Sequence, residues 1–99
     1  MAFGFFDSAA NVAFAKEIAQ DIQTSFPNTP EPATVKSIEK DRKKLDAIIA
    51  RTKSFSDHNK PNIYKKAKFL NTIKWQLKES GHDPLFINEM VRLLAMVMN

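Results

Sequence analysis

Apolar residues recur three and four positions apart in four separate segments of this chain, and that period limits the fold more than any other feature. Such spacing places the apolar side chains on one face of an α-helix and leaves the polar ones opposite. In the first segment the residues on that face are Phe14, Ala15, Ile18, Ala19, Ile22 and Phe26. No stretch of four or more residues alternates with the period of two that a half-buried strand requires. The sequence therefore predicts an all-α protein.

Prolines and capping residues mark the ends of the first two predicted helices. The first helix is expected at about residues 8–25, with Asp7 or Ser8 as its N-cap. Prolines then make a stiff connection over residues 27–32. The second helix is expected at about residues 34–55, as one continuous segment.

Similar signals delimit the last two predicted helices. A polar loop at residues 56–61 leads into a third helix at about residues 61–80. Gly81 follows it, and a residue without a Cβ suits the left-handed backbone that often ends a helix. Asp83 and the proline after it provide an N-cap and a first-turn residue for a fourth helix at about residues 84–97.

Length and composition fit a single domain, residues 1–99, with the form of a small four-helix bundle-like domain. Hydrophobic residues make up 43% of the chain, which is enough to supply a core without covalent cross-links. The chain has no cysteine, and this excludes disulfide bonds, thiolate metal sites and thiol catalysis.

The apolar faces also predict which side chains form the core. On the third helix they are Ile63, Ala67, Leu70, Ile73 and Leu77. The fourth helix has a wider apolar arc, made by Phe86, Ile87, Met90, Val91, Leu93, Leu94, Val97 and Met98, which leaves Leu85 and Met96 on the polar side. An arc of that width indicates either several packing neighbours or apolar surface left over for a partner.

Groups that could form a catalytic or cofactor site are few and scattered. His58 and His82 both fall in predicted loops, and Gly4 and Gly81 are too far apart to form a phosphate-binding loop. His82 follows the third predicted helix, where it is expected to interact with the negative end of the helix dipole. The sequence predicts no enzyme activity, no metal site and no cofactor.

Positive charge is concentrated in the middle of the chain. Residues 34–80 carry a net charge of +8, against −3 before them and −1 after them. Lysines and aromatic rings at helical spacing predict a surface for nucleic acid or an acidic partner, made by Lys36, Lys40, Lys43, Lys44, Arg51, Tyr64, Lys68 and Trp75. The commoner explanations are that the lysines are only solvated and that Tyr64 and Trp75 pack between helices.

The wide apolar arc of the fourth predicted helix gives the leading hypothesis on function. We expect a non-enzymatic protein that acts through contacts with another protein or a second copy of itself, using this helix and the apolar N-terminus. Its candidate self-association surface is Val91, Leu93 and Met98. Nucleic-acid binding by the basic segment is the alternative.

Contact with a membrane is not expected. Phe3, Phe5, Phe6 and Phe14 are residue types that insert at a membrane surface, but the acidic balance of the first helix opposes this. No stretch reaches the ~20 apolar residues needed to span a bilayer. The sequence therefore predicts a cytoplasmic protein.

Overall fold

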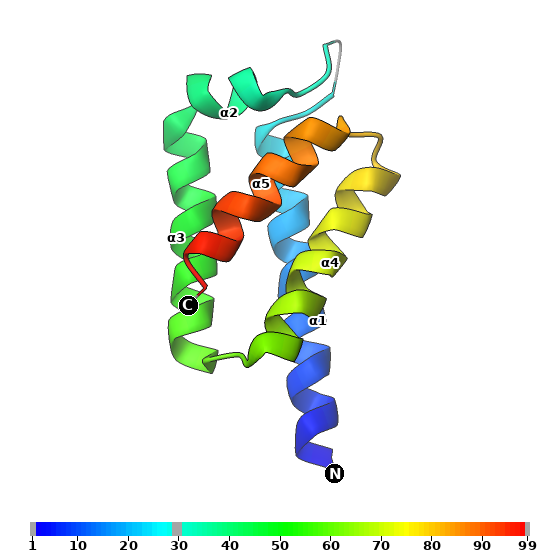
Figure 1. Ribbon diagram of the computed structural model, residues 1–99, viewed down its shortest axis with the longest axis vertical. Helices are drawn as coiled ribbons and strands as arrows, with labels where there is room; N and C mark the ends of the chain where they lie inside the picture. Colours follow the sequence, from blue (N-terminus) through cyan, green and yellow to red (C-terminus); the bar gives the residue numbers. More distant parts are fainter. Residues whose placement is uncertain (1, 29–30, 99) are drawn as a thin grey trace.

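Five helices and their connections make up the part of the chain that the computed structural model describes, residues 2–28 and 31–98, with side chains from residue 9 onward (Figure 1). They are α1 (Ala2–Ser25), α2 (Val35–Lys40), α3 (Arg42–Asn59), α4 (Ile63–Glu79) and α5 (Pro84–Met96). These residues contain no strand, so the all-α fold class is confirmed. The predicted number of four helices is wrong by one.

The packing partners of the helices do not follow their order in the chain. α4 lies along α1, and α5 packs against α4, α3 and α2, while α1 also contacts α3. Although the rings of Phe55 and Phe69 stack with centroids 5.7 Å apart, the backbones of the consecutive helices α3 and α4 do not lie close together within the described residues. They run along opposite sides of the molecule, and α5 crosses the space between them (Figure 1). The basic segment that contains them is therefore not a packed hairpin.

The core draws side chains from all five helices and from their connections. Its fully buried members include Ala15, Ile18, Ile73, Leu77, Phe86 and Leu94. Three phenylalanine rings stack on one another. The ring centroid of Phe14 on α1 is 4.3 Å from that of Phe55 on α3 and 6.0 Å from that of Phe69 on α4, and the Phe55 and Phe69 centroids are 5.7 Å apart. This aromatic stack joins the three long helices at one place.

The second predicted helix is interrupted at Asp41. That residue has φ −117° and ψ 60°, which is outside the helical region, and it ends α2 and caps α3. The break lets α2 turn across the end of the bundle, where Ile38 is buried and the helix contacts α5 (Figure 1). The apolar period runs through both helices in phase, so the spacing alone indicated one continuous helix.

Other predicted helix ends move by one to six residues. α1 begins at Ala2 rather than near residue 8, and no proline in its first turns prevents this. α3 continues to Asn59 through the predicted polar loop, because these polar side chains bond back to the helix. The side chains of Asp57, His58 and Asn59 each contact a group four residues earlier. α4 begins at Ile63, since Asn62 and not a residue before Pro61 caps it.

The buried face of α4 differs from the predicted one in its first half. Ile63 is 83% exposed and Ala67 is also exposed, whereas Phe69, absent from the predicted core, is fully buried. Ile73 and Leu77 are buried as predicted. The helix is rotated so that Phe69 joins the aromatic stack of Phe14 and Phe55, which turns the side chain of Ile63 outward.

The turn between α4 and α5 agrees with prediction and adds a buried histidine. Gly81 has φ +81°, and the Asp83 carboxylate accepts hydrogen bonds from the first-turn amides of α5. His82 is buried against Phe86. Its Nε2 donates to the carbonyl oxygen of Phe26 at 2.8 Å, and its Nδ1 lies 2.8 Å from Ser80 Oγ. His82 thus ties the end of α1 to the end of α4, a role beyond the predicted dipole interaction.

Replacing His82 by Ala is expected to lower the free energy of unfolding by about 1–3 kcal/mol, because the buried Phe26 carbonyl loses its donor. The matched control is His58→Ala, at an exposed histidine that contacts only its own helix, with an expected change below about 0.5 kcal/mol. Urea unfolding followed by circular dichroism measures both. Equal effects of the two substitutions would contradict the role given to His82.

Candidate interaction surface

α4 carries two large aromatic side chains on the side that faces away from the core. Tyr64 is 63% exposed and Trp75 is 62% exposed. The expectation that their rings pack between helices is therefore wrong. α4 has neighbours only on its other side, where Phe69, Ile73 and Leu77 are buried against α1 and α5.

These two rings belong to a continuous strip along the helix. With about 100° of rotation per residue, seven residues fall within an arc of about 120°. We call them the α4 outer face: Tyr64, Ala67, Lys68, Asn71, Lys74, Trp75 and Lys78, all of which are exposed. Tyr64 and Trp75 lie within about 20° of each other around the helix and about 16 Å apart along its axis, at 1.5 Å per residue. Lys74 and Lys78 were missed as site residues, although the same spacing that indicated Lys68 includes them.

The charge of α4 sets it apart from the rest of the molecule. Its 17 residues include five lysines and one glutamate, Glu79, which is the last residue of the helix. The remainder of the chain has ten basic and ten acidic residues, so α4 carries the whole net charge of +4. Within the described residues, Lys68 and Lys74 have no carboxylate within ion-pair distance.

Lys78 is placed directly beside one of the rings. Its Nζ lies 5.4 Å from the centroid of the Trp75 ring, in the geometry of a cation–π interaction. The ammonium group thus covers one side of the indole without a competing carboxylate. The Trp75 ring and the Lys78 ammonium group therefore lie side by side at the C-terminal end of the α4 outer face.

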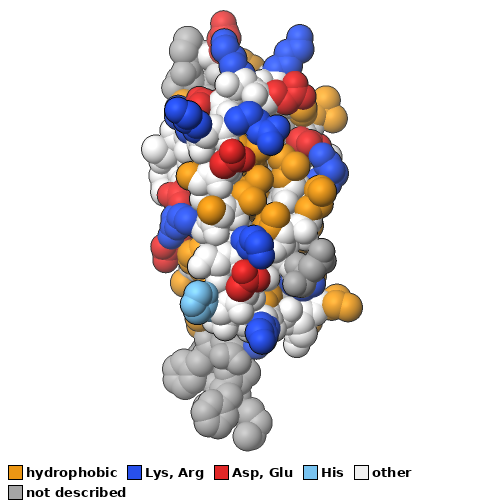
Figure 2. Space-filling view, turned by 90° about the vertical axis from the view of Figure 1, so that its left-hand side faces the viewer, with side chains coloured by type: hydrophobic (Ala, Val, Ile, Leu, Met, Phe, Trp, Pro, Cys, Tyr) orange, Lys and Arg blue, Asp and Glu red, His pale blue; other side chains and the backbone are white. Residues whose placement is uncertain are grey.

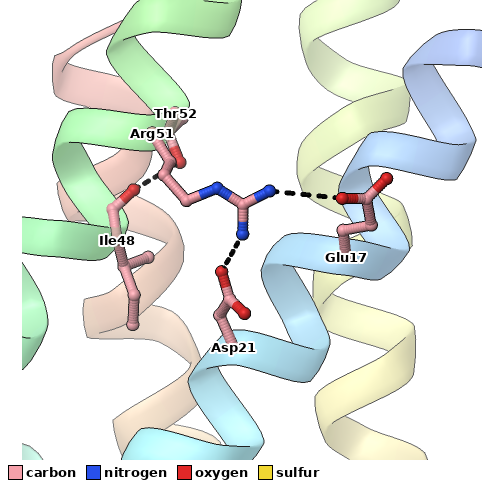
Figure 3. Close-up of polar contacts among 5 residues, drawn as sticks. All are labelled: Glu17, Asp21, Ile48, Arg51 and Thr52. Carbon is pink, nitrogen blue, oxygen red and sulfur yellow. Dashed lines mark hydrogen bonds and ion pairs between the residues drawn. The ribbon is translucent and has the colours of Figure 1, made fainter.

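Three of the five lysines and arginines of α3 are in a different electrostatic setting, because each is paired with a carboxylate. Arg51 donates to the carboxylate of Asp21 and, at 3.2 Å, to that of Glu17, so its guanidinium is committed to α1 (Figure 3). Lys44 pairs with Asp41 at 3.3 Å, and Lys53 with Asp57 at 3.1 Å. The side of the molecule on which α3 lies shows acidic side chains interspersed among the basic ones (Figure 2).

The predicted basic surface is therefore two separate regions. Lys36 and Lys40 on α2, and Lys43 and Lys44 on α3, are exposed but belong to the side with mixed charge. Tyr64, Lys68 and Trp75 are exposed on α4. This helix lies on the other side of the bundle from α3 (Figure 1). The α4 residues of the predicted basic surface therefore lie together, whereas its α2 and α3 residues lie elsewhere.

The apolar arc of α5 is largely used inside the chain. Phe86, Ile87, Met90 and Leu94 are buried, and Met98, placed by a turn after the helix, is fully buried as well. Met98 is thus not a surface residue, and its assignment to the self-association surface is corrected. Val91 and Leu93 are half-buried and pack against the core. The arc is wide because α5 has three neighbouring helices, α2, α3 and α4.

The polar side of α5 is balanced in charge. Arg92 donates to both carboxylate oxygens of Glu89, at 3.0 Å and 2.6 Å, and these hydrogen bonds lower the pKa of the Glu89 carboxyl. The exposed Leu85 and Met96 lie on the side of α5 that the sequence predicted. Arg92 thus resembles Lys44, Arg51 and Lys53 of α3, which are also paired, and differs from Lys68 and Lys74 of α4, which have no ion pair within the described residues.

The apolar N-terminus lies mainly outside the described residues. The side chains of Phe3, Phe5 and Phe6 belong to that part, whereas Phe14 is half-buried in the aromatic stack. None of the helices in the described part has the length and hydropathy needed to cross a membrane.

Histidines and carboxylates do not converge in the described part of the chain, where no three such groups could share a metal ion. Among these residues, Ser80 and His82 form the one hydrogen bond between a serine hydroxyl and a histidine ring, but both ring nitrogens of His82 are occupied, by Ser80 and by the Phe26 carbonyl. Ser80 Oγ in turn lies 2.9 Å from the carbonyl oxygen of Leu77. These hydrogen bonds belong to the polar contacts at the C-terminal end of α4.

Comparison of the chain with protein-family models, with curated proteins and with solved structures found no match. The function is therefore argued from the chemistry of the α4 outer face.

Replacing Leu93 by Glu is expected to lower the free energy of unfolding by about 1–3 kcal/mol, because the charge would enter a side of α5 that packs against the core. Leu85→Glu, at a residue that is 69% exposed on the same helix, is the matched control and should change it by less than about 0.5 kcal/mol. Urea unfolding measures stability, and sedimentation measures mass. A dimeric parent that Leu93→Glu converts into a stable, folded monomer would establish self-association through α5 instead.

Proposed function

We propose that this chain is a non-enzymatic binding protein and that the α4 outer face is its binding surface for nucleic acid. The observation that carries the proposal is the coincidence, on one exposed helix face, of two aromatic rings and three lysines that form no ion pair with a carboxylate in the described part of the chain. Neutralising phosphates with lysine releases counterions and supplies most of the affinity of non-specific nucleic-acid binding. A cytoplasmic location belongs to the same proposal, since nucleic acid is accessible there.

The charge of α4 argues against a second copy of the chain as the occupant of this face. A symmetric dimer would place two helices of net charge +4 against each other, and like charges facing one another oppose association. An anionic partner gains from the same charge. Phosphate groups provide the highest density of negative charge among such partners, about one per 1.7 Å of duplex.

A second candidate function is contact with an acidic, partly apolar surface of another protein. The exposure of Ile63, an aliphatic residue at the edge of the α4 outer face, favours it. Tyr and Trp are also enriched among residues that dominate protein–protein binding energy, whereas Lys is depleted at such interfaces. The lysines therefore favour nucleic acid over protein.

Replacing Lys68, Lys74 and Lys78 together by Gln is expected to abolish most of the nucleic-acid affinity at low salt. Three phosphate contacts give a logarithmic salt slope of about −2 to −3, so the parent should lose about 20- to 40-fold in affinity between 50 and 200 mM salt. Fluorescence anisotropy with a labelled oligonucleotide measures both effects. The triple variant should bind weakly at either salt concentration.

The matched control is Lys36→Gln, Lys40→Gln and Lys43→Gln, which removes the same charge from the side of α2 and α3. It should retain most of the affinity. An equal loss in both triple variants would mean that net charge alone governs binding, and the assignment to α4 would be wrong. Absence of binding to any oligonucleotide at 50 mM salt would reject nucleic acid as the ligand. Binding of polyglutamate with dependence on α4 would then support the protein partner.

A further inference from the structure

We infer that the ligand of the α4 outer face is single-stranded nucleic acid, whose bases stack on Trp75 and Tyr64. This inference rests on the proposed function and specifies the form of its ligand. Lysines alone would not distinguish a single strand from a duplex, because both present phosphates. The two aromatic rings make the distinction.

Exposed rings at the surface of a helix need a flat partner in order to stack. In a duplex the faces of the bases are covered by their neighbours, and only the edges of the bases and the backbone are accessible. An unpaired strand offers base faces, and stacking of a base on an aromatic side chain contributes about 1–3 kcal/mol. Tyr64 and Trp75, both more than half exposed, are thus matched to an unpaired strand rather than to a duplex.

The arrangement of the α4 outer face fits a strand that runs along the helix axis. The two rings are about 16 Å apart, a length that about five nucleotides cover at 3.4 Å each. Lysines flank the line between the rings on both sides, with Lys68 on one side and Lys74 and Lys78 on the other. A strand that stacks on both rings would therefore keep its phosphates within reach of lysines.

Trp75 is the stronger of the two stacking positions. Lys78 holds its ammonium group over the indole, 5.4 Å from the ring centroid, and so occupies one face of the ring. The opposite face remains for a base, next to a positive charge that meets the adjoining phosphate. Tyr64 has no cation–π partner among the described contacts and is the secondary position.

Tryptophan fluorescence can report on this interaction, because Trp75 is the only tryptophan in the chain. Selective excitation of indole emission therefore reports the environment of one residue in the proposed site. An oligothymidylate of about 12 nucleotides, more than twice the length of the face, should quench this emission as it binds. The same strand annealed to its complement should bind more weakly and leave the emission nearly unchanged.

Substitutions separate stacking from charge. Trp75→Ala should weaken binding of the single strand by about 5- to 150-fold, the range that corresponds to the loss of one stacked base. Trp75→Phe keeps a ring and should restore most of the affinity, while Tyr64→Ala should have a smaller effect than Trp75→Ala. Leu85→Ala, at an exposed apolar residue outside the α4 outer face, is the control and should have no effect. Anisotropy measures the affinity of these variants, and circular dichroism checks that each is folded.

The outcomes distinguish this inference from the proposed function. Equal affinity for strand and duplex, with Trp75→Ala as tight as the parent, would overturn single-strand stacking and leave nucleic-acid binding by the lysines in place. Absence of binding to both forms would overturn both. Tight binding of polyglutamate that also quenches Trp75 would assign the same surface to an acidic protein and overturn the inference.

Discussion

The contact between α1 and α4 is the constraint on which the rest of the structure depends. α1 provides Ala15, Ile18 and Ile22 to the core, all fully buried, and α4 provides Phe69, Ile73 and Leu77. Alanine on one of the two packed helices allows the axes to approach closely, and the larger side chains fill the space between them. Once α4 is fixed on α1 by this face, the opposite face must point to solvent.

That constraint explains why aromatic rings and charge appear together outside the bundle. The packing of α4 uses Phe69 for the aromatic stack with Phe14 and Phe55, which leaves Tyr64 and Trp75 without a partner helix. An exposed aromatic ring does not contribute the free energy of burying its apolar surface, and lysines without a carboxylate partner repel one another. Elsewhere, Arg51 and Arg92 are neutralised by neighbouring carboxylates. A group of such departures from local stability on one face is typical of a binding surface.

α5 illustrates how tertiary structure changes the interpretation of an apolar pattern. A wide arc on the last helix of a four-helix bundle would leave surface for a partner. The break at Asp41 adds α2 as a further neighbour, and α5 then packs against three helices. Met98 returns to the core after the helix ends, so the chain itself covers most of the arc.

The sequence by itself determined the helical class, the position of the turn at Gly81–Pro84 and most of the buried faces. The spacing of apolar residues, the backbone preferences of glycine and proline, and the helix caps all act over a few neighbouring residues. It also located the excess positive charge between residues 34 and 80. Only the tertiary structure decided that Arg51 is neutralised by α1 and that the rings of Tyr64 and Trp75 are exposed. Arg51 meets Glu17 and Asp21 across 30 or more residues of chain, and the consecutive helices α3 and α4 touch through Phe55 and Phe69 although their backbones do not lie side by side. Such contacts depend on how the helices pack against one another, and the local spacing of residues does not encode them.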